Sequence, residues 1–175
     1  PHSFEVCYKS EDVVSEDILK SLMYAFLVAD VRNALTRHPD TLRNRRMLIF
    51  GAGMSGHLAA YIHSRTCPES QIVVVDPSSE RLESVKEVSP NSISTFQLPE
   101  DVMTTLADAQ NRGLVNIRTY EVIAGIQSEM RRQFKGRTCD LLFDCSSGNS
   151  APLWDNADIL SSGCHAIPFG FGSKN

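Results

Sequence analysis

Three glycines at positions 51, 53 and 56 are spaced in the way that suits binding of a phosphate group. They follow a short apolar run, Met47–Phe50, and form the pattern Gly-x-Gly-x-x-Gly. In this pattern the first glycine allows a tight turn, the second lets the backbone approach a pyrophosphate, and the third lets a helix pack closely on the strand. The free N–H groups at the start of that helix would face the phosphates. The segment therefore predicts a site for the pyrophosphate of a dinucleotide.

An acidic residue, Asp76, ends a second apolar run, Ile72–Val75, and lies twenty residues after Gly56. A carboxylate at this place accepts hydrogen bonds from the 2′- and 3′-hydroxyl groups of the adenosine ribose. It also repels a 2′-phosphate, so NAD is favoured over NADP as the cofactor. Arg81 follows five residues later, and its guanidinium could reach the ribose or a 2′-phosphate. With Asp76 present we expect Arg81 to contact the ribose of NAD; the alternative is a solvent-facing helix arginine.

Two further segments are expected on the nicotinamide side of the site. Ser146 and Ser147 follow a predicted apolar strand, and Phe169, Gly170 and Phe171 end the next one. Ligands of parallel α/β sheets bind outside the carboxyl ends of the strands. We therefore expect the serines to line the nicotinamide ribose, with a plain turn as the alternative. A backbone N–H or carbonyl group of the second segment could hold the carboxamide.

The sequence shows no set of residues that predicts a catalytic centre or a metal site. His63 and Cys67 are four residues apart, but two ligands are too few for zinc. His57 follows the third glycine of the turn, and His165 lies within a predicted strand, where a structural role is expected. No Ser/His/Asp or Cys/His arrangement can be assembled, so no catalytic residue is assigned within this chain.

The overall composition is that of a soluble globular domain. The chain has 175 residues, of which 42% are hydrophobic and 22% charged, and its net charge is −4. No basic stripe is present, which argues against a nucleic-acid partner. No apolar stretch reaches the roughly 18 residues of a membrane span, and the N-terminus does not resemble a signal peptide. We therefore expect a cytoplasmic protein, and the sequence leaves open whether it forms a homo-oligomer.

The spacing of the five cysteines does not predict a disulfide framework. Their number is odd, the intervals between them are long, and no Cys-x-x-Cys occurs. This pattern fits a reducing compartment. Cys139, Cys145 and Cys164 lie in or beside apolar runs, so we interpret them as buried structural thiols.

Strands alternate with helices along the chain, which predicts an α/β fold with a doubly wound, mostly parallel sheet of the Rossmann type. A long helix beginning after Ser15 leads into this domain. The secondary structure of residues 89–98 is ambiguous, because Ile93–Phe96 could be a short strand or part of an inserted loop. Strands are predicted at 46–50, 71–76, 114–118, 139–145 and 164–169, and helices at 54–65, 79–88, 99–112, 121–134 and 151–161.

The sequence resembles the cofactor-binding half of the medium-chain dehydrogenase/reductase superfamily, the zinc alcohol dehydrogenase-like proteins. The segments RMLIFGAGMSGHLAA and IVVVDPSSERLESVKE resemble the first strand with its glycine turn and the second strand with its acidic residue. CDLLFDCSSG and GCHAIPFGFGS resemble the fourth and fifth strands. PHSFEVCYKSEDVVSEDILKSL resembles the segment that leaves the catalytic domain. The stretch 88–110 is longer than is usual between the second and third strands.

The resemblance implies that the three glycines bind the pyrophosphate and that Asp76 and Arg81 bind the adenosine ribose. It also implies that the backbone of Met54 and Ser55 approaches the centre of the cofactor. Ser55 stands where many members have an apolar residue.

For domain organisation, the resemblance implies that residues 1–40 form a connecting segment and lead-in helix. Residues 41–175 then form an NAD(P)-binding Rossmann domain without its last strand. A catalytic domain, which could hold zinc, would precede Pro1, and a sixth strand would follow Asn175. Hydride transfer to a small-molecule substrate is thus expected in a longer parent oxidoreductase, and these 175 residues alone are expected to be inactive.

Two other functions stay open at the level of sequence. A glycine turn of this kind also serves non-catalytic dinucleotide-binding modules. A methyltransferase that uses S-adenosylmethionine also combines a glycine-rich turn with an acidic residue after the second strand. Its turn is usually less strictly spaced, and its sheet adds an antiparallel strand, for which the chain shows no hairpin signal.

Overall fold

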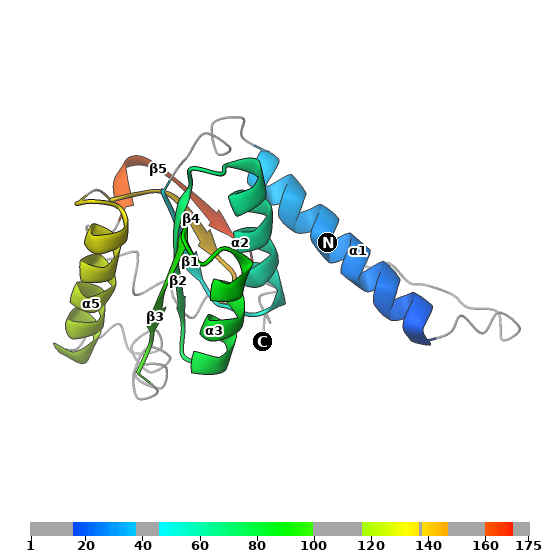
Figure 1. Cartoon of the computed structure of the whole chain (residues 1–175), viewed down its shortest axis with the longest axis horizontal. Helices are drawn as coiled ribbons and strands as arrows, with labels where there is room; N and C mark the ends of the chain where they lie inside the picture. Colours follow the sequence, from blue (N-terminus) through cyan, green and yellow to red (C-terminus); the bar gives the residue numbers. More distant parts are fainter. Residues whose placement is uncertain (1–15, 38–45, 100–116, 137, 147–159, 170–175) are drawn as a thin grey trace, which may run out of the picture.

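The computed structural model describes residues 16–37, 46–99, 117–136, 138–146 and 160–169, which form a parallel sheet with helices on both faces (Figure 1). The strands in this part of the chain are β1 (Arg46–Phe50), β2 (Gln71–Asp76), β3 (Ile93–Gln97), β4 (Cys139–Asp144) and β5 (Leu160–Pro168). They lie in the order β3-β2-β1-β4-β5, and all neighbouring pairs are parallel. The chain adds β2 and β3 on one side of the central β1 and then β4 and β5 on its other side, which confirms the predicted doubly wound fold.

The described helices cover the two faces of the sheet unequally. They are α1 (Glu16–Thr36), α2 (Met54–Thr66), α3 (Ser79–Val88) and α5 (Ile117–Gln133). Helix α5 covers one face, whereas α2, α3 and the C-terminal part of α1 cover the other (Figure 1). The bounds of α2 and α3 agree closely with the helices predicted from the sequence.

The central strands are apolar throughout because both of their faces are buried. In β1, Leu48 and Phe50 pack on the side of α5, and Met47 and Ile49 pack on the side of α1, α2 and α3. None of these four side chains is more than 1% exposed. Since each contributes roughly 1.5–3 kcal/mol when removed from water, β1 is fixed firmly in the middle of the core. Its carboxyl end, where the glycine turn begins, is fixed with it.

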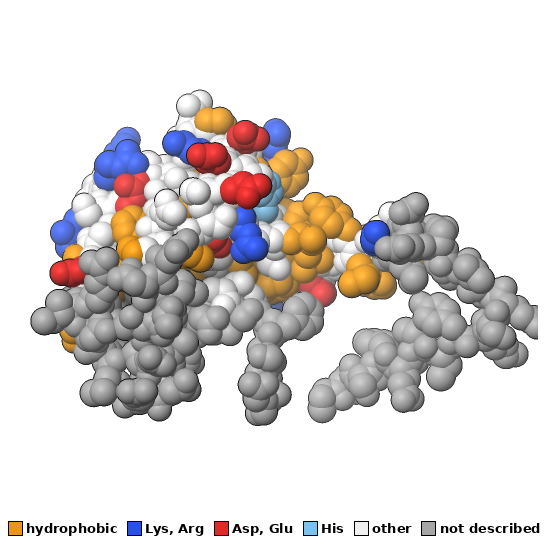
Figure 2. All heavy atoms as spheres, turned by 90° about the horizontal axis from the view of Figure 1, so that it is seen from below, with side chains coloured by type: hydrophobic (Ala, Val, Ile, Leu, Met, Phe, Trp, Pro, Cys, Tyr) orange, Lys and Arg blue, Asp and Glu red, His pale blue; other side chains and the backbone are white. Residues whose placement is uncertain are grey.

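Helix α1 packs on the described part of the sheet domain mainly through its C-terminal part. Val31 and Leu35 are fully or almost fully buried against the domain, whereas Met23 and Phe26 are 72% and 68% exposed. Figure 1 shows the N-terminal part of α1 extending away from the sheet, and Figure 2 shows hydrophobic side chains gathered along it. The described part of the chain therefore leaves large apolar side chains in the N-terminal part of α1 exposed.

The third strand lies earlier in the sequence than predicted. The ambiguous residues form β3, which pairs with β2 through Ile72↔Ile93 and Asp76↔Gln97. The strand expected at 114–118 is wrong where it can be checked, because Ile117 begins α5. Apolar residues spaced three and four apart in α5, including Val122 and Ile126, are buried against the sheet. This helical burial overrides the local strand preference of the run, so no long insertion separates the second and third strands.

Two element boundaries also differ from the predicted ones. β5 begins at Leu160 and not at Cys164, because Leu160 pairs with Cys139 of β4. The predicted helix 151–161 is therefore wrong at its end. The sequence also offers Ser79 as the cap of the helix at 79–88, but the N-cap of α3 is Ser78, since its Oγ accepts a hydrogen bond from the Arg81 N–H at 3.3 Å. Residues 151–159 of the predicted helix 151–161, residues 100–112 of the helix predicted at 99–112, and Ser15 lie outside the described residues.

Candidate functional site

The glycine turn that follows β1 begins in a backbone conformation that residues other than glycine adopt only with strain. Gly51 has φ +94°, in the left-handed region that side chains with a Cβ disfavour. Its N–H donates to the Val75 carbonyl oxygen at 2.8 Å, which ties the turn to β2. A Cβ at this position would also lie 3.1 Å from both the carbonyl oxygen and Sγ of Cys145. The turn is thus enclosed by the ends of β2 and β4.

The other two glycines of the motif have opposite surroundings. A Cβ added to Gly56 would lie 1.8 Å from the Gly51 carbonyl oxygen, so α2 can pack on the turn only with a glycine there. A Cβ added to Gly53 would meet nothing within 4 Å. Gly56 therefore serves packing, whereas Gly53 borders open space. The approach of a pyrophosphate to the Gly53 backbone stays a prediction.

The first turn of α2 presents backbone N–H groups without a side-chain cap. Gly53 is the N-cap residue, and it has no side chain with which to accept a hydrogen bond. The first turn of α2 contains no acidic residue. The N-terminal N–H groups and the positive end of the helix dipole therefore favour an anion at this point. Met54, at the start of the helix, is 59% exposed, and Ser55 is half-buried.

Asp76 joins the end of β2 to the glycine turn. Its side chain is 3% exposed, and both of its oxygens accept backbone hydrogen bonds. Oδ2 accepts from the Ala52 N–H at 2.7 Å, and Oδ1 accepts from the Ser78 N–H at 2.8 Å. A carboxylate has about four lone-pair positions, so two bonds leave acceptor capacity for hydroxyl groups. Sequence reasoning identified the residue but missed the bond to Ala52.

The thiol of Cys145 is a further support of the turn, and sequence reasoning assigned it only a general structural role. Its Sγ lies 3.0 Å from the Phe50 carbonyl oxygen and 3.1 Å from that of Gly51, and the S–H can donate to either. Its backbone N–H donates to the Phe50 oxygen at 2.9 Å. Burial, reinforced by the Asp144 and Asp76 carboxylates, raises the pKa of Cys145 to about 12. The thiol therefore stays protonated and remains a donor at neutral pH.

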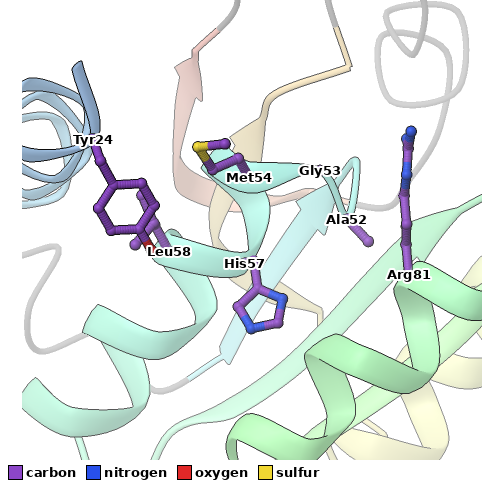
Figure 3. A pocket seen from close by; sticks show the side chains of 7 residues that line it. All are labelled: Tyr24, Ala52, Gly53, Met54, His57, Leu58 and Arg81. Atoms are coloured by element: carbon purple, nitrogen blue, oxygen red, sulfur yellow. The ribbon is translucent and has the colours of Figure 1, made fainter. Parts of the chain in front are cut away.

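A pocket of about 240 Å³ opens beside the first turn of α2 (Figure 3). Arg81 of α3 stands on one side of it, next to Ala52, and Tyr24 of α1 stands on the opposite side. The imidazole of His57 lies between them. The pocket is lined by Tyr24, Ala52, Gly53, Met54, His57, Leu58 and Arg81. Gly53, Met54 and Arg81 were predicted as site residues, whereas Tyr24 and Leu58 carried no signal beyond apolar helix periodicity.

The ends of β4 and β5 lie at the same edge of the sheet as the glycine turn. Asp144 Oδ1 accepts hydrogen bonds from the N–H and Oγ of Ser146, at 3.0 and 2.7 Å. The N–H of Phe169 donates to the Asp144 carbonyl oxygen at 2.6 Å, and its ring stacks on Phe143 with centroids 5.2 Å apart. Ser146 and Phe169 are thus brought together around Asp144. Ser147, Gly170 and Phe171 lie outside the described residues.

The remaining candidates give no further site. Within the described ranges, no group of three or more His, Cys, Asp or Glu side chains is placed to hold a metal ion. His63 is 1% exposed within α2, and Cys67 ends that helix. None of the described helices is both long enough and apolar enough to cross a membrane.

The chain is similar to known proteins in its structure, but its sequence matches no known family. No family model and no curated protein matches the sequence. The structure is similar to an alcohol dehydrogenase from Thermotoga maritima, with 19% identity and a TM-score of 0.55 over 87% of this chain and 36% of that one. It is also similar to a short chain alcohol dehydrogenase from E. coli CFT073 complexed with NADH, with 18% identity and a TM-score of 0.51.

That second match covers 95% of this chain and 40% of the other. A third is a crotonyl-CoA carboxylase/reductase, AntE, in complex with NADP, with 18% identity and a TM-score of 0.50 over 73% and 31% of the two chains. The chain thus spans two fifths or less of each of these proteins. At this identity the matches establish the fold, which is the one that the sequence pattern predicts.

The contrast between Gly56 and Gly53 gives a test of the turn. Gly56→Ala should lower the free energy of unfolding by about 2–3 kcal/mol, because overpacking against a backbone oxygen exceeds the gain in helix propensity. Gly53→Ala is the matched control and should change it by less than about 0.5 kcal/mol. Urea unfolding followed by circular dichroism measures both. Equal stability of the two variants would contradict the packing role of Gly56.

The raised pKa of Cys145 predicts a loss of stability in alkali. The thiol has a pKa of about 12 in the folded chain, but one of about 8.5 when unfolded. Its contribution is therefore complete below about pH 8.5 and is lost as the pH rises towards 12, at up to about 1.4 kcal/mol per pH unit. Cys145→Ala should show a shallower decline in urea-unfolding free energy above about pH 9. Parallel curves for the two proteins would rule out this contribution.

Proposed function

We propose that this chain is the NAD(H)-binding domain of an oxidoreductase of the medium-chain, alcohol or polyol dehydrogenase-like type. The observation that carries the proposal is the junction at the carboxyl ends of β1 and β2. There an uncapped helix start, open space at Gly53 and the buried Asp76 carboxylate lie side by side. The structural similarity to proteins complexed with NADH and NADP, and the sequence resemblance, support the same function.

The pyrophosphate would be held at the first turn of α2. The N–H groups there are oriented along the helix axis and favour an anion. The open space at Gly53 allows phosphate oxygens to approach the backbone directly. The exposed Arg81, which lines the same pocket, would add positive charge beside the phosphates or the ribose.

The adenosine ribose would hydrogen-bond to Asp76. The carboxylate is held in place by the Ala52 and Ser78 N–H groups, so its remaining lone pairs are oriented before the ligand arrives. Its negative charge would repel the 2′-phosphate of NADP, which favours NAD. Arg81 would attract a 2′-phosphate, but from an exposed position where solvent weakens the attraction.

The nicotinamide would lie towards the ends of β4 and β5. Ser146 and Phe169 are held at this edge by Asp144, and Ser147, Gly170 and Phe171 are proposed to extend the same lining. The bound cofactor would supply hydride transfer, and the residues of this chain would bind and orient it. The substrate, and zinc if it is used, would be bound by other parts of a longer protein.

Direct titration tests the proposal. We expect NADH to bind with higher affinity than NADPH, and S-adenosylmethionine not to bind measurably. Isothermal titration calorimetry of the 175-residue chain with each compound provides the comparison. Binding of S-adenosylmethionine without binding of NADH would instead favour a methyltransferase.

Substitution of Asp76 tests its role in selectivity. Asp76→Ala should weaken NADH binding roughly 10- to 100-fold, the value of one charge-assisted hydrogen bond. It should also reduce the preference for NADH over NADPH, because the repulsion of the 2′-phosphate is lost. The ratio of the two affinities is the informative quantity, since loosening of the turn at Ala52 affects both ligands. Glu83→Ala, which removes an exposed acid of α3, is the charge-matched control. An unchanged ratio in Asp76→Ala would exclude Asp76 from the ribose site.

A further inference from the structure

Two cysteines from neighbouring strands lie in contact on the α5 face of the sheet, away from the glycine turn. Cys139 begins β4 and Cys164 lies in β5, and their Sγ atoms are 3.8 Å apart. Cys139 is fully buried, and Cys164 is half-buried beside the same apolar cluster. β5 is the last strand in the described sheet, so Cys164 lies at an edge.

An irregularity in strand pairing brings the two sulfur atoms to the same face. Regular alternation would place Cys139 on the face of Leu141 and Phe143, which pack with α1, α2 and α3. Cys139 instead packs with Leu142 on the α5 face. The register of β4 with β5 shifts between Cys139 and Leu141, as in a β-bulge. Without this shift, Cys139 and Cys164 would lie on opposite faces of the sheet.

A side-chain ion pair holds the irregular segment. Asp140, the residue between Cys139 and Leu141, accepts two hydrogen bonds from Arg46 at the start of β1, one of them from Nε at 2.7 Å. Both side chains are about four-fifths buried. This two-pronged contact holds Asp140, the residue after Cys139, to the start of β1.

The two thiols differ in their readiness to ionise. The pKa of Cys164 is lowered, because its sulfur accepts a hydrogen bond from the Cys139 thiol. The pKa of Cys139 is raised, because its thiol donates that bond and is buried. Cys164 is also the more accessible of the two, so an oxidant would reach its thiolate first.

We propose that Cys139 and Cys164 are a redox-sensitive pair that forms a reversible disulfide, independently of the proposed cofactor site. With hydrogen peroxide as oxidant, the Cys164 thiolate attacks one peroxide oxygen and releases hydroxide, which gives a sulfenic acid. The Cys139 sulfur then attacks the Cys164 sulfur and displaces the hydroxyl group, which leaves as water with the Cys139 proton. In total, two thiols lose two hydrogen atoms and one peroxide is reduced to two waters. A dithiol reductant reverses the reaction by thiol–disulfide exchange.

The bond would fasten the edge strand β5 to β4. It would close the chain between positions 139 and 164, a segment that includes Ser146 at the sheet edge. Closing a loop of this length restricts the unfolded chain and stabilises the folded one. Oxidation should therefore raise the midpoint of thermal unfolding by roughly 5–10 °C, and a reductant should reverse the rise.

Peptide mapping of the native chain tests the proposal. The protein is treated with hydrogen peroxide in native buffer, remaining thiols are alkylated, and a non-reduced digest is analysed by mass spectrometry. We expect the Cys139–Cys164 cross-linked peptide to be the main oxidised product and to disappear after treatment with dithiothreitol. The reference is the same chain oxidised in denaturant, which should give a mixture of disulfide pairings.

Two single variants sharpen the result. Cys164→Ser should abolish both the cross-link and the rise in unfolding midpoint, and Cys67→Ser should leave both intact. The peptide map of the unsubstituted chain tests the proposal by itself, so the test does not depend on the folding of either variant. Recovery of Cys139 and Cys164 as alkylated thiols, conversion of Cys164 to sulfinic acid without a cross-link, or the same mixture of pairings as in denaturant would each overturn the proposal.

Discussion

The hydrogen bond from the Ala52 N–H to the Asp76 carboxylate is the contact on which the rest of the site depends. It joins the turn after β1 to the end of β2 at 2.7 Å, within a buried environment. The Gly51 N–H bond to Val75 runs beside it, and the Cys145 thiol supports the turn from β4. A buried carboxylate is tolerated only when it is hydrogen-bonded, so Asp76 and the turn require each other. The helix start is thereby held in a fixed position before any ligand binds.

This arrangement explains why the pocket lies where it does. Both faces of the sheet are filled by apolar side chains, so a polar ligand can be accommodated only at the edge where the strands end. At that edge the chain supplies an uncapped helix start, a carboxylate and an exposed guanidinium within a short stretch of sequence. In the proposed function, the carboxylate would accept hydrogen bonds from the adenosine ribose, and the helix start and the guanidinium would face the pyrophosphate. Binding would then need little rearrangement, which would lower its entropic cost.

β4 connects the two chemically distinct parts of the molecule. Its carboxyl end carries Cys145 and Asp144, which support the glycine turn and the Ser146–Phe169 edge. Its amino end carries Cys139, turned by the register shift towards Cys164. The proposed disulfide would therefore act, from the other end of the sheet, on the same strand that supports the proposed nicotinamide side of the site.

The sequence by itself determined the glycine turn and the strands and helices that flank it, because these depend on local spacing and on continuous apolar runs. For the same reason it singled out Asp76 and Arg81 as candidate site residues. It did not place the third strand, since both 93–97 and 114–118 have strand-like composition and only burial of α5 on the sheet separates them. The contacts of Asp76 with Ala52 and of Cys145 with Gly51 were likewise decided by tertiary structure. So was the meeting of Cys139 with Cys164, because a register shift between strands leaves no mark in the local sequence.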